Sequence, residues 1–194
     1  MSESTTTGVT SQLADGTAAG SWVLDPAQSR AEFRVKHLMI SNVRGQFTGV
    51  TGKLTYDPAD IAKSHVEALI DVATIDTRDP QRDTHLKSPD FFDVEQFPSM
   101  TFSSSSVTRK ADGTVAVSGP LTIHGATHEV EFTVEGPTPP VKDPWGNTRV
   151  GLQASTKIIR KDFGLNFNAA LETGGVMVGE EVSLTLELEF VQAS

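Results

Sequence analysis

The sequence predicts an all-β domain of about eight antiparallel strands, closed into a barrel and carrying one short helix near residues 79–87. Three observations support this fold. Apolar and polar residues alternate with a period of two over most of the chain from residue 22 onward, as expected when one face of each strand is buried and the other is wet. Turn-forming residues separate the alternating segments. The last segment is long and strongly apolar, and barrel closure would leave it no exposed edge.

The alternation is most regular in three segments, which cover residues 31–37, 129–135 and 182–190. Less regular alternation occupies residues 46–56, 64–75, 100–108, 114–124 and 148–160. Strands at this spacing occur in sandwiches and in barrels, and a barrel of about eight strands can enclose one small elongated ligand. Glycines in the segment 46–56 and just before it predict a bulge or a sharp bend there: Gly45, Gly49 and Gly52.

One segment between the strands has helical signals instead. Asp79 directly precedes Pro80, which suits an N-cap followed by proline in the first helical turn. We expect the helix to end near Lys87 because a proline follows two residues later. Phe91 and Phe92 come next and are apolar enough to plug an opening in the barrel.

Composition excludes several classes of function. The net charge of −9 argues against a nucleic-acid partner, because binding to phosphates requires a basic surface. The chain has no cysteine, which excludes disulfides, thiolate nucleophiles and Cys-ligated metals. No apolar run approaches the roughly 20 residues of a membrane-spanning helix, so no integral membrane association is expected.

The first residues differ in composition from the rest. Residues 1–20 are rich in Ser, Thr, Gly and Ala and show no strand or helix period. We expect a disordered tail over 1–20 and a single barrel domain over 21–194. The tail has neither the basic nor the apolar region of a secretory signal peptide, so a cytoplasmic location is expected.

Sequence blocks spread over about residues 22–192 carry a family resemblance. They are Leu24-Asp25-Pro26, Phe33-Arg34-Val35-Lys36-His37, Gly45-Gln46-Phe47, Arg82-Asp83-Thr84-His85-Leu86-Lys87-Ser88-Pro89-Asp90-Phe91-Phe92, Phe97-Pro98-Ser99-Met100-Thr101-Phe102, Gly119-Pro120-Leu121-Thr122-Ile123-His124-Gly125, Arg160-Lys161-Asp162-Phe163-Gly164-Leu165 and Val178-Gly179-Glu180-Glu181-Val182. In this order they resemble the YceI-like family, the polyisoprenoid-binding proteins with a lipocalin-like barrel. The chain departs from the family at Gln28, where many members carry His, and at His128, where Lys is common.

The resemblance implies a carrier that holds a long isoprenoid or other alkyl lipid in an apolar tunnel, with no enzyme activity and no cofactor. Polyprenyl phosphates and the side chain of a quinone are the leading ligands, and a homodimer is left open. Many relatives are exported. The residues expected to line the tunnel are Phe33, Val35, Phe47, Leu54, Val66, Ile70, Phe102, Val117, Phe132, Leu152, Leu184 and Leu186. Periodicity alone would let the same residues fill a packed core.

A ligand head group is expected to meet the short helix at the barrel mouth. Arg suits a phosphate and His a hydroxyl or quinone oxygen. The residues expected there are His37, Arg82, His85, Phe91 and Phe92. In the alternative interpretation, Arg82 and Asp83 pair with strand ends and only fix the helix. A basic lip for docking at a membrane would draw on Arg34, Lys36, Arg44 and Lys53.

Two other functions compete with the carrier. The first is a small hydrolase or metal-dependent enzyme that uses His85, or His124 and His128, which flank a tight turn. Imidazole suits zinc or copper, but no third ligand follows in the sequence and no Gly-x-Ser-x-Gly elbow is present. The second is a barrel with a filled interior that acts as an interaction module.

Overall fold

The computed structural model describes residues 20–172 and 174–193. The tail predicted over 1–20 lies outside them except for Gly20, which begins a strand. The strands are β1 (Gly20–Leu24), β2 (Arg30–His37), β3 (Ser41–Phe47), β4 (Val50–Tyr56), β5 (His65–Asp71), β6 (Ile75–Asp76), β7 (Ser99–Ser103), β8 (Ser106–Arg109), β9 (Val115–Ile123), β10 (Ala126–Glu135), β11 (Val141–Lys142), β12 (Thr148–Ile159) and β13 (Val178–Gln192). The helix is α1 (Pro80–Lys87), and three 3₁₀ turns are η1 (Ile61–Lys63), η2 (Val72–Thr74) and η3 (Arg160–Phe163).

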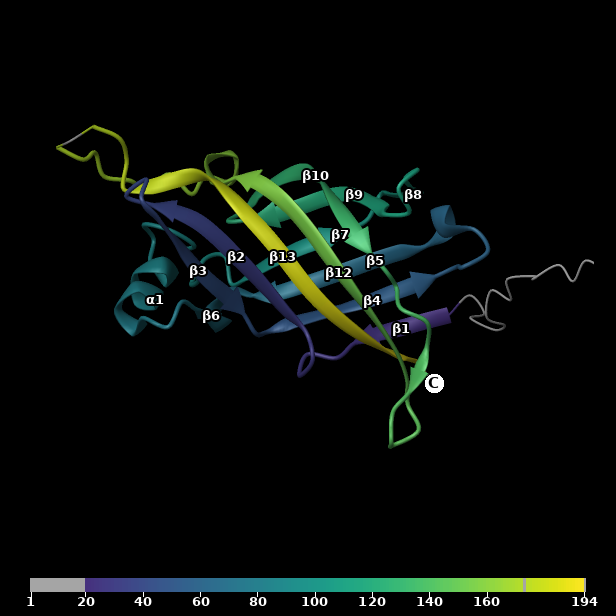
Figure 1. Cartoon of the computed structure of the whole chain (residues 1–194). Helices are drawn as coiled ribbons and strands as arrows, with labels where there is room; N and C mark the ends of the chain where they lie inside the picture. Colours follow the sequence, from purple (N-terminus) through teal and green to yellow (C-terminus); the bar gives the residue numbers. More distant parts are fainter. Residues whose placement is uncertain (1–19, 173, 194) are drawn as a thin grey trace, which may run out of the picture.

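Eight strands close into an antiparallel barrel, as predicted. The ring runs β1-β4-β5-β7-β9-β10-β12-β13 and returns to β1. Its longest seam joins β12 to β13 over eleven residue pairs, so the long apolar C-terminal strand has partners on both sides. Figure 1 shows β12 and β13 crossing the barrel side by side, with α1 near one end, which we call the helix end.

Three of the predicted strands, 46–56, 64–75 and 100–108, are each divided into two, the last of them into β7 and β8. β1 and β2 pair in turn with the same edge of β13, while β3 pairs with β2 and β4 pairs with β1. The predicted segment 46–56 is therefore two strands, interrupted at Gly49. A Cβ at Gly49 would lie 2.7 Å from the Thr74 Cγ2 atom, so only glycine fits this bend. Likewise, η2 divides the segment 64–75 into β5 and β6.

The helix matches its prediction residue for residue. Asp79 is extended and its carboxylate accepts hydrogen bonds from the backbone N–H groups of Gln81 and Arg82, each at 3.1 Å. Pro80 occupies the first turn, and the helix ends at Lys87. None of the described helices is long and apolar enough to cross a membrane.

The most tightly packed side chains lie outside the central cavity described below. They are Trp22, Val50, Val72, Phe163 and Phe190, each less than 2% exposed except Phe163 at 2%. All belong to one apolar cluster that reaches from β1 to η3. The two alternatives of a packed core and a hollow interior therefore both apply, to different parts of the same barrel.

An ion cluster at the end opposite α1 ties several segments together. Arg149 on β12 donates to Asp25 at 2.7 Å, to Asp143 at 2.7 Å and to Glu189 at 2.6 Å. The hydrogen bond from Arg149 holds the pKa of Asp143 well below its usual range, and the same side chain lowers the pKa of Asp25. These contacts join β13 and β12 to the β1–β2 turn and to the 143–147 turn.

We expect Arg149→Met to lower the melting temperature at pH 7. A carboxylate with a depressed folded pKa adds stability above its unfolded pKa, near 3.9 for Asp, and this stability is lost as the pH falls through the folded value. The difference from the wild type should therefore shrink below about pH 4. Melting curves between pH 7 and pH 2.5 check this, with the exposed Arg109→Met as control. A difference that stays constant with pH would contradict the assignment.

Candidate lipid-binding site

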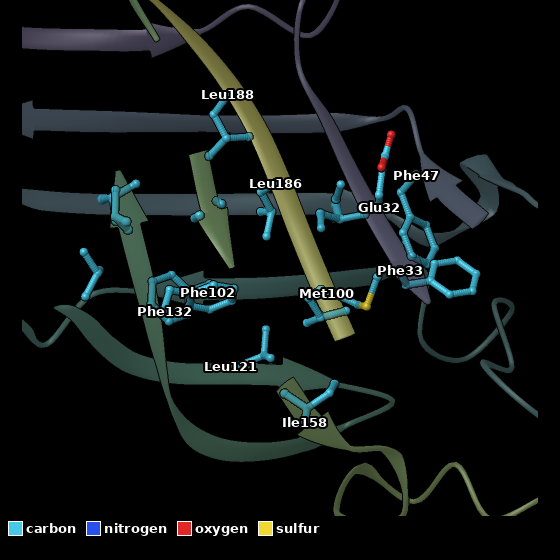
Figure 2. Close-up of a pocket in the computed structure, with 18 of the residues that line it drawn as sticks. Glu32, Phe33, Phe47, Met100, Phe102, Leu121, Phe132, Ile158, Leu186 and Leu188 are labelled. Carbon is cyan, nitrogen blue, oxygen red and sulfur yellow. The ribbon is translucent and has the colours of Figure 1, made fainter. Parts of the chain in front are cut away.

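A cavity of about 230 Å³ lies inside the barrel. Its wall is almost wholly apolar and is built from inward positions of every strand in the ring except β1. At the helix end it reaches Leu86 and Phe92, and at the other end it reaches Val115 and Pro137. Figure 2 shows side chains from β2, β7, β10 and β13 converging on this space. Its length and apolar lining suit a chain-like ligand.

The structure brings together all twelve residues that the sequence singles out for the tunnel. Each lines the cavity: Phe33, Val35, Phe47, Leu54, Val66, Ile70, Phe102, Val117, Phe132, Leu152, Leu184 and Leu186. Phe91 and Phe92 line it as well. His37, Arg82 and His85 do not belong to the lining. That these positions bind a ligand stays a prediction.

Aromatic rings shape both halves of the cavity. Near the helix end, the ring centroids of Phe33 and Phe47 are 5.7 Å apart, and Phe92 meets Phe47 edge-on at 5.9 Å. Toward the other end, Phe102 and Phe132 form an edge-on pair at 5.1 Å, visible in Figure 2. Edge-on rings pack favourably while leaving apolar faces and edges toward the space between them.

Gly45 explains how the Phe33 ring is seated. A Cβ at position 45 would lie 2.4 Å from Phe33 Cζ, so the ring occupies the space directly over the glycine. Gly45 lies opposite Phe33 in the β2–β3 pairing. The predicted bulge or bend at Gly45 is wrong, because the β2–β3 pairing runs through it without a register shift; the glycine instead makes room for a cavity-lining ring.

Arg82 and Asp83 fix the helix to the strand that precedes it. The Arg82 guanidinium donates to Thr77 Oγ1 at 2.8 Å and to the Thr77 carbonyl at 3.0 Å. Asp83 accepts from the Thr77 N–H at 2.9 Å and from its hydroxyl at 2.6 Å. These contacts match the interpretation in which the two side chains pin the helix.

We expect Arg82→Met to loosen α1 without changing the identity of bound lipid. The buried Thr77 would lose a charge-assisted hydrogen bond, which costs about 1–3 kcal/mol of folding stability. Chemical unfolding and lipid extraction of the same preparation check both parts. If the head-group class of the bound lipid changed at constant stability, Arg82 would be a ligand contact instead.

Neither His37 nor His85 lines the cavity. A bulge in β13 separates the pairing of Val35 from that of His37, although the alternation of β2 itself continues through His37, which is half-buried. His85 Nε2 lies 2.8 Å from Asp90 Oδ2, and its ring meets Phe167 edge-on at 4.9 Å. These contacts do not support a role for His37 or His85 in binding a head group, and that role stays a prediction.

The paired-histidine alternative finds no support. His124 has a positive φ of 51° at the β9–β10 turn and packs against Phe97, with ring centroids 4.6 Å apart. His128 instead lies 2.8 Å from the Asp162 carbonyl oxygen. Across residues 20–172 and 174–193, no group of three His, Asp or Glu side chains is placed to hold a metal.

Arg160 is a cavity residue that the predictions missed. It is 4% exposed, lines the cavity near the helix end, and donates to the carbonyls of Gly179 at 2.7 Å and Val178 at 3.2 Å, and to that of Leu165. Burial lowers the pKa of its guanidinium. The signal was present in the sequence, because Arg160 continues the inward phase of Leu152 and Ile158 along β12 and η3.

Known proteins resemble this chain in sequence and in fold. The sequence model described as the YceI-like domain matches residues 22–190. The UPF0312 protein SA2479 of Staphylococcus aureus is 40% identical over 172 residues, which cover 87% of this chain and 96% of that protein.

Two solved structures show the same fold. The crystal structure of BcnA from Burkholderia cenocepacia superposes with a TM-score of 0.73 at 24% identity, covering 86% of this chain and 98% of BcnA. A domain from Saccharophagus degradans, described as a polyisoprenoid binding domain implicated in plant cell wall breakdown, gives a TM-score of 0.63 at 16% identity, covering 89% and 98%. With its closed barrel and the match over residues 22–190, the chain belongs to the YceI-like family.

Proposed function

We propose that this protein is a soluble carrier that holds one long isoprenoid or other alkyl lipid inside the barrel and performs no chemistry on it. The observation that carries the proposal is the continuous apolar cavity, lined from Phe92 at the helix end to Pro137 at the other. The description of the Saccharophagus degradans domain as polyisoprenoid-binding supports the choice of ligand.

The energetics favour such a ligand. Burying one CH₂ group yields about 0.8 kcal/mol, so each five-carbon isoprene unit offers about 3–4 kcal/mol of transfer free energy. Ordering a flexible chain takes back part of this, yet several units leave enough for tight binding without a polar contact. The lipid should therefore be selected mainly by length and width.

Arg160 supports a polar or anionic end on the ligand. Its guanidinium has five N–H donors, and the structure shows three of its nitrogens bonded to backbone carbonyls. Among the described residues no carboxylate lies within ion-pair distance of it. A phosphate or quinone oxygen at the helix end would meet this cation in a low-dielectric wall. Polyprenyl phosphates and quinones are therefore the leading ligands. As a separate part of the proposal, we place the carrier in the cytoplasm.

Organic extraction of the purified protein tests the function, with lipid mass spectrometry and metal analysis on the same sample. We expect a prenyl or long alkyl lipid at about one molecule per chain, enriched over an unrelated protein purified from the same cells. Stoichiometric metal without lipid would favour the metal-dependent enzyme. Finding neither, also after incubation with prenyl lipids, would leave the filled interaction module.

A further inference from the structure

The turn between β2 and β3 presents three consecutive apolar side chains to solvent. Leu38 is 36% exposed, Met39 56% and Ile40 82%. The turn lies at the helix end of the barrel, next to residues 174–177, at the upper left of Figure 1. Exposed apolar side chains that are contiguous and sit at a tip mark an interaction site.

The backbone of this turn is strained at two of these apolar residues. Leu38 and Met39 have φ angles of 51° and 59°, in the left-handed region that Gly and Asn adopt most easily. The turn is also fixed in place, because the Leu38 N–H donates to the Met177 carbonyl at 2.8 Å and the Ile40 N–H donates to the His37 carbonyl at 3.1 Å. If the turn only had to connect β2 to β3, Asn-Gly at positions 38 and 39 would adopt these φ angles with less strain.

Positive charge surrounds the tip on a strongly acidic protein. Residues 33–47 contain three basic residues and no acidic one, whereas the whole chain carries a net charge of −9. Arg34 lies directly opposite Arg44 across the β2–β3 pair, and Lys36 is opposite Asn42. Like charges in facing positions repel each other, so this arrangement does not serve the stability of the hairpin.

These cations are not neutralised within the part of the chain that the structure describes. No ion pair there includes Arg34, Lys36 or Arg44. The nearest acidic residues at the start of β13, Glu180 and Glu181, bind Lys161 and Lys157 instead. Lys53, the fourth residue of the predicted basic lip, lies apart from the hairpin on β4. In the β4–β5 register it stands opposite Glu67.

We propose that the β2–β3 hairpin docks the barrel on the surface of an anionic lipid bilayer. Leu38, Met39 and Ile40 enter the interfacial region, while the basic residues of the hairpin lie against the lipid phosphates. Val35 on β2 and Val178 on β13 line the cavity just behind this tip, so docking brings the helix end of the cavity to the membrane. The inference goes beyond the proposed function, which concerns the interior of the barrel.

A second exposed apolar turn provides the matched control. Trp145 on the 143–147 turn is 82% exposed, and Val141 on the adjoining strand β11 is 63% exposed; both lie at the opposite end of the barrel. Acidic residues surround this turn, since Asp143 lies within it and Asp25 and Glu189 share Arg149 with it. If apolar exposure alone were enough, both turns would bind vesicles. Of these two turns, the β2–β3 hairpin is the one that combines an apolar tip with positive charge.

Vesicle flotation tests the docking surface. The probes are phosphatidylcholine vesicles with and without phosphatidylglycerol, at low and at high salt. We expect the wild type to float with the anionic vesicles only, and less at high salt. Arg34→Gln with Arg44→Gln should weaken partitioning roughly 25-fold, at about fivefold for each charge. Met39→Ser with Ile40→Ser should weaken it at least as much, and Val141→Ser with Trp145→Ser should leave it unchanged.

Lipid extraction and melting curves on every variant separate this inference from the proposed function. Lost flotation with a retained cavity lipid and an unchanged melting temperature supports docking. Absent wild-type flotation, or flotation that both hairpin variants retain, overturns docking and leaves the carrier function standing. A third outcome would also overturn docking. If the wild type is a dimer that does not float, and the Met39→Ser, Ile40→Ser variant is a monomer, the tip is an interface between copies of the chain. Flotation lost as expected by a protein that holds no lipid would support docking and reject the carrier.

Discussion

Leu186→Trp is expected to expel long lipids from the barrel or to shorten the longest chain that it retains. Leu186 lies midway along β13 and points into the cavity in Figure 2. Its neighbours on the two flanking strands are both alanines, Ala154 on β12 and Ala31 on β2. An indole therefore has room to extend into the 230 Å³ cavity, where it takes the place of ligand. We expect the bound lipid to fall severalfold while the lipid-free protein stays folded.

The matched control is Leu69→Trp, which makes the same change on the outer face of β5. Leu69 is 42% exposed and does not line the cavity, so neither lipid content nor stability should change appreciably. Extraction of both variants checks the prediction. In a filled core, Leu186→Trp would instead overpack the interior and cost about 1–3 kcal/mol with no effect on lipid, and that result would reject the cavity.

Truncation of two phenylalanines is expected to give unequal losses of stability. Phe190 is fully buried, belongs to the packed cluster and does not line the cavity, so Phe190→Ala should cost about 3–5 kcal/mol. Phe33 borders the cavity, so part of its surface faces ligand space and not other side chains. Phe33→Ala should therefore cost clearly less in the lipid-free protein, and should mainly broaden the range of lipids bound.

Urea unfolding of the delipidated variants measures this difference, because the free energy of unfolding follows from the transition midpoint at constant slope. The comparison holds the residue type fixed and changes only the packing. Equal losses at the two positions, with unchanged lipid content in Phe33→Ala, would show that Phe33 is an ordinary core residue.

The barrel and its inward residues could be predicted because both follow from the local alternation of apolar and polar residues along each strand. Period-two alternation assigns each side chain to a face, and this assignment holds for residues as far apart as Phe33 and Leu186. The cap of α1 is equally local, since Asp79 bonds only to the first turn that it begins. Alternation could not show whether the interior is packed or hollow, because the same apolar residues serve both.

Other features depend on contacts between distant segments and were missed for that reason. The bend at Gly49 was predicted, but not the division of segment 46–56 into two strands with different partners, which is set by Thr74, 25 residues later, whose hydroxyl accepts the Gly49 N–H at 2.9 Å. His37 keeps the inward phase of β2 but does not line the cavity, and a bulge in the partner strand β13 separates its pairing from that of Val35. Arg160 was not among the predicted cavity residues, because the carbonyls of Leu165, Val178 and Gly179 that hold a buried guanidinium there come together only in the fold.

Native mass spectrometry of the delipidated protein, titrated with prenyl lipids of graded length, tests the central claim most directly. We expect a one-to-one complex whose affinity rises with each isoprene unit until the cavity between Phe92 and Pro137 is filled, and then levels off. Leu186→Trp should reach that plateau at a shorter chain, and Leu69→Trp should match the wild type. No complex at any length, or binding that is weak, independent of chain length and unchanged by Leu186→Trp, would contradict a lipid held inside the barrel.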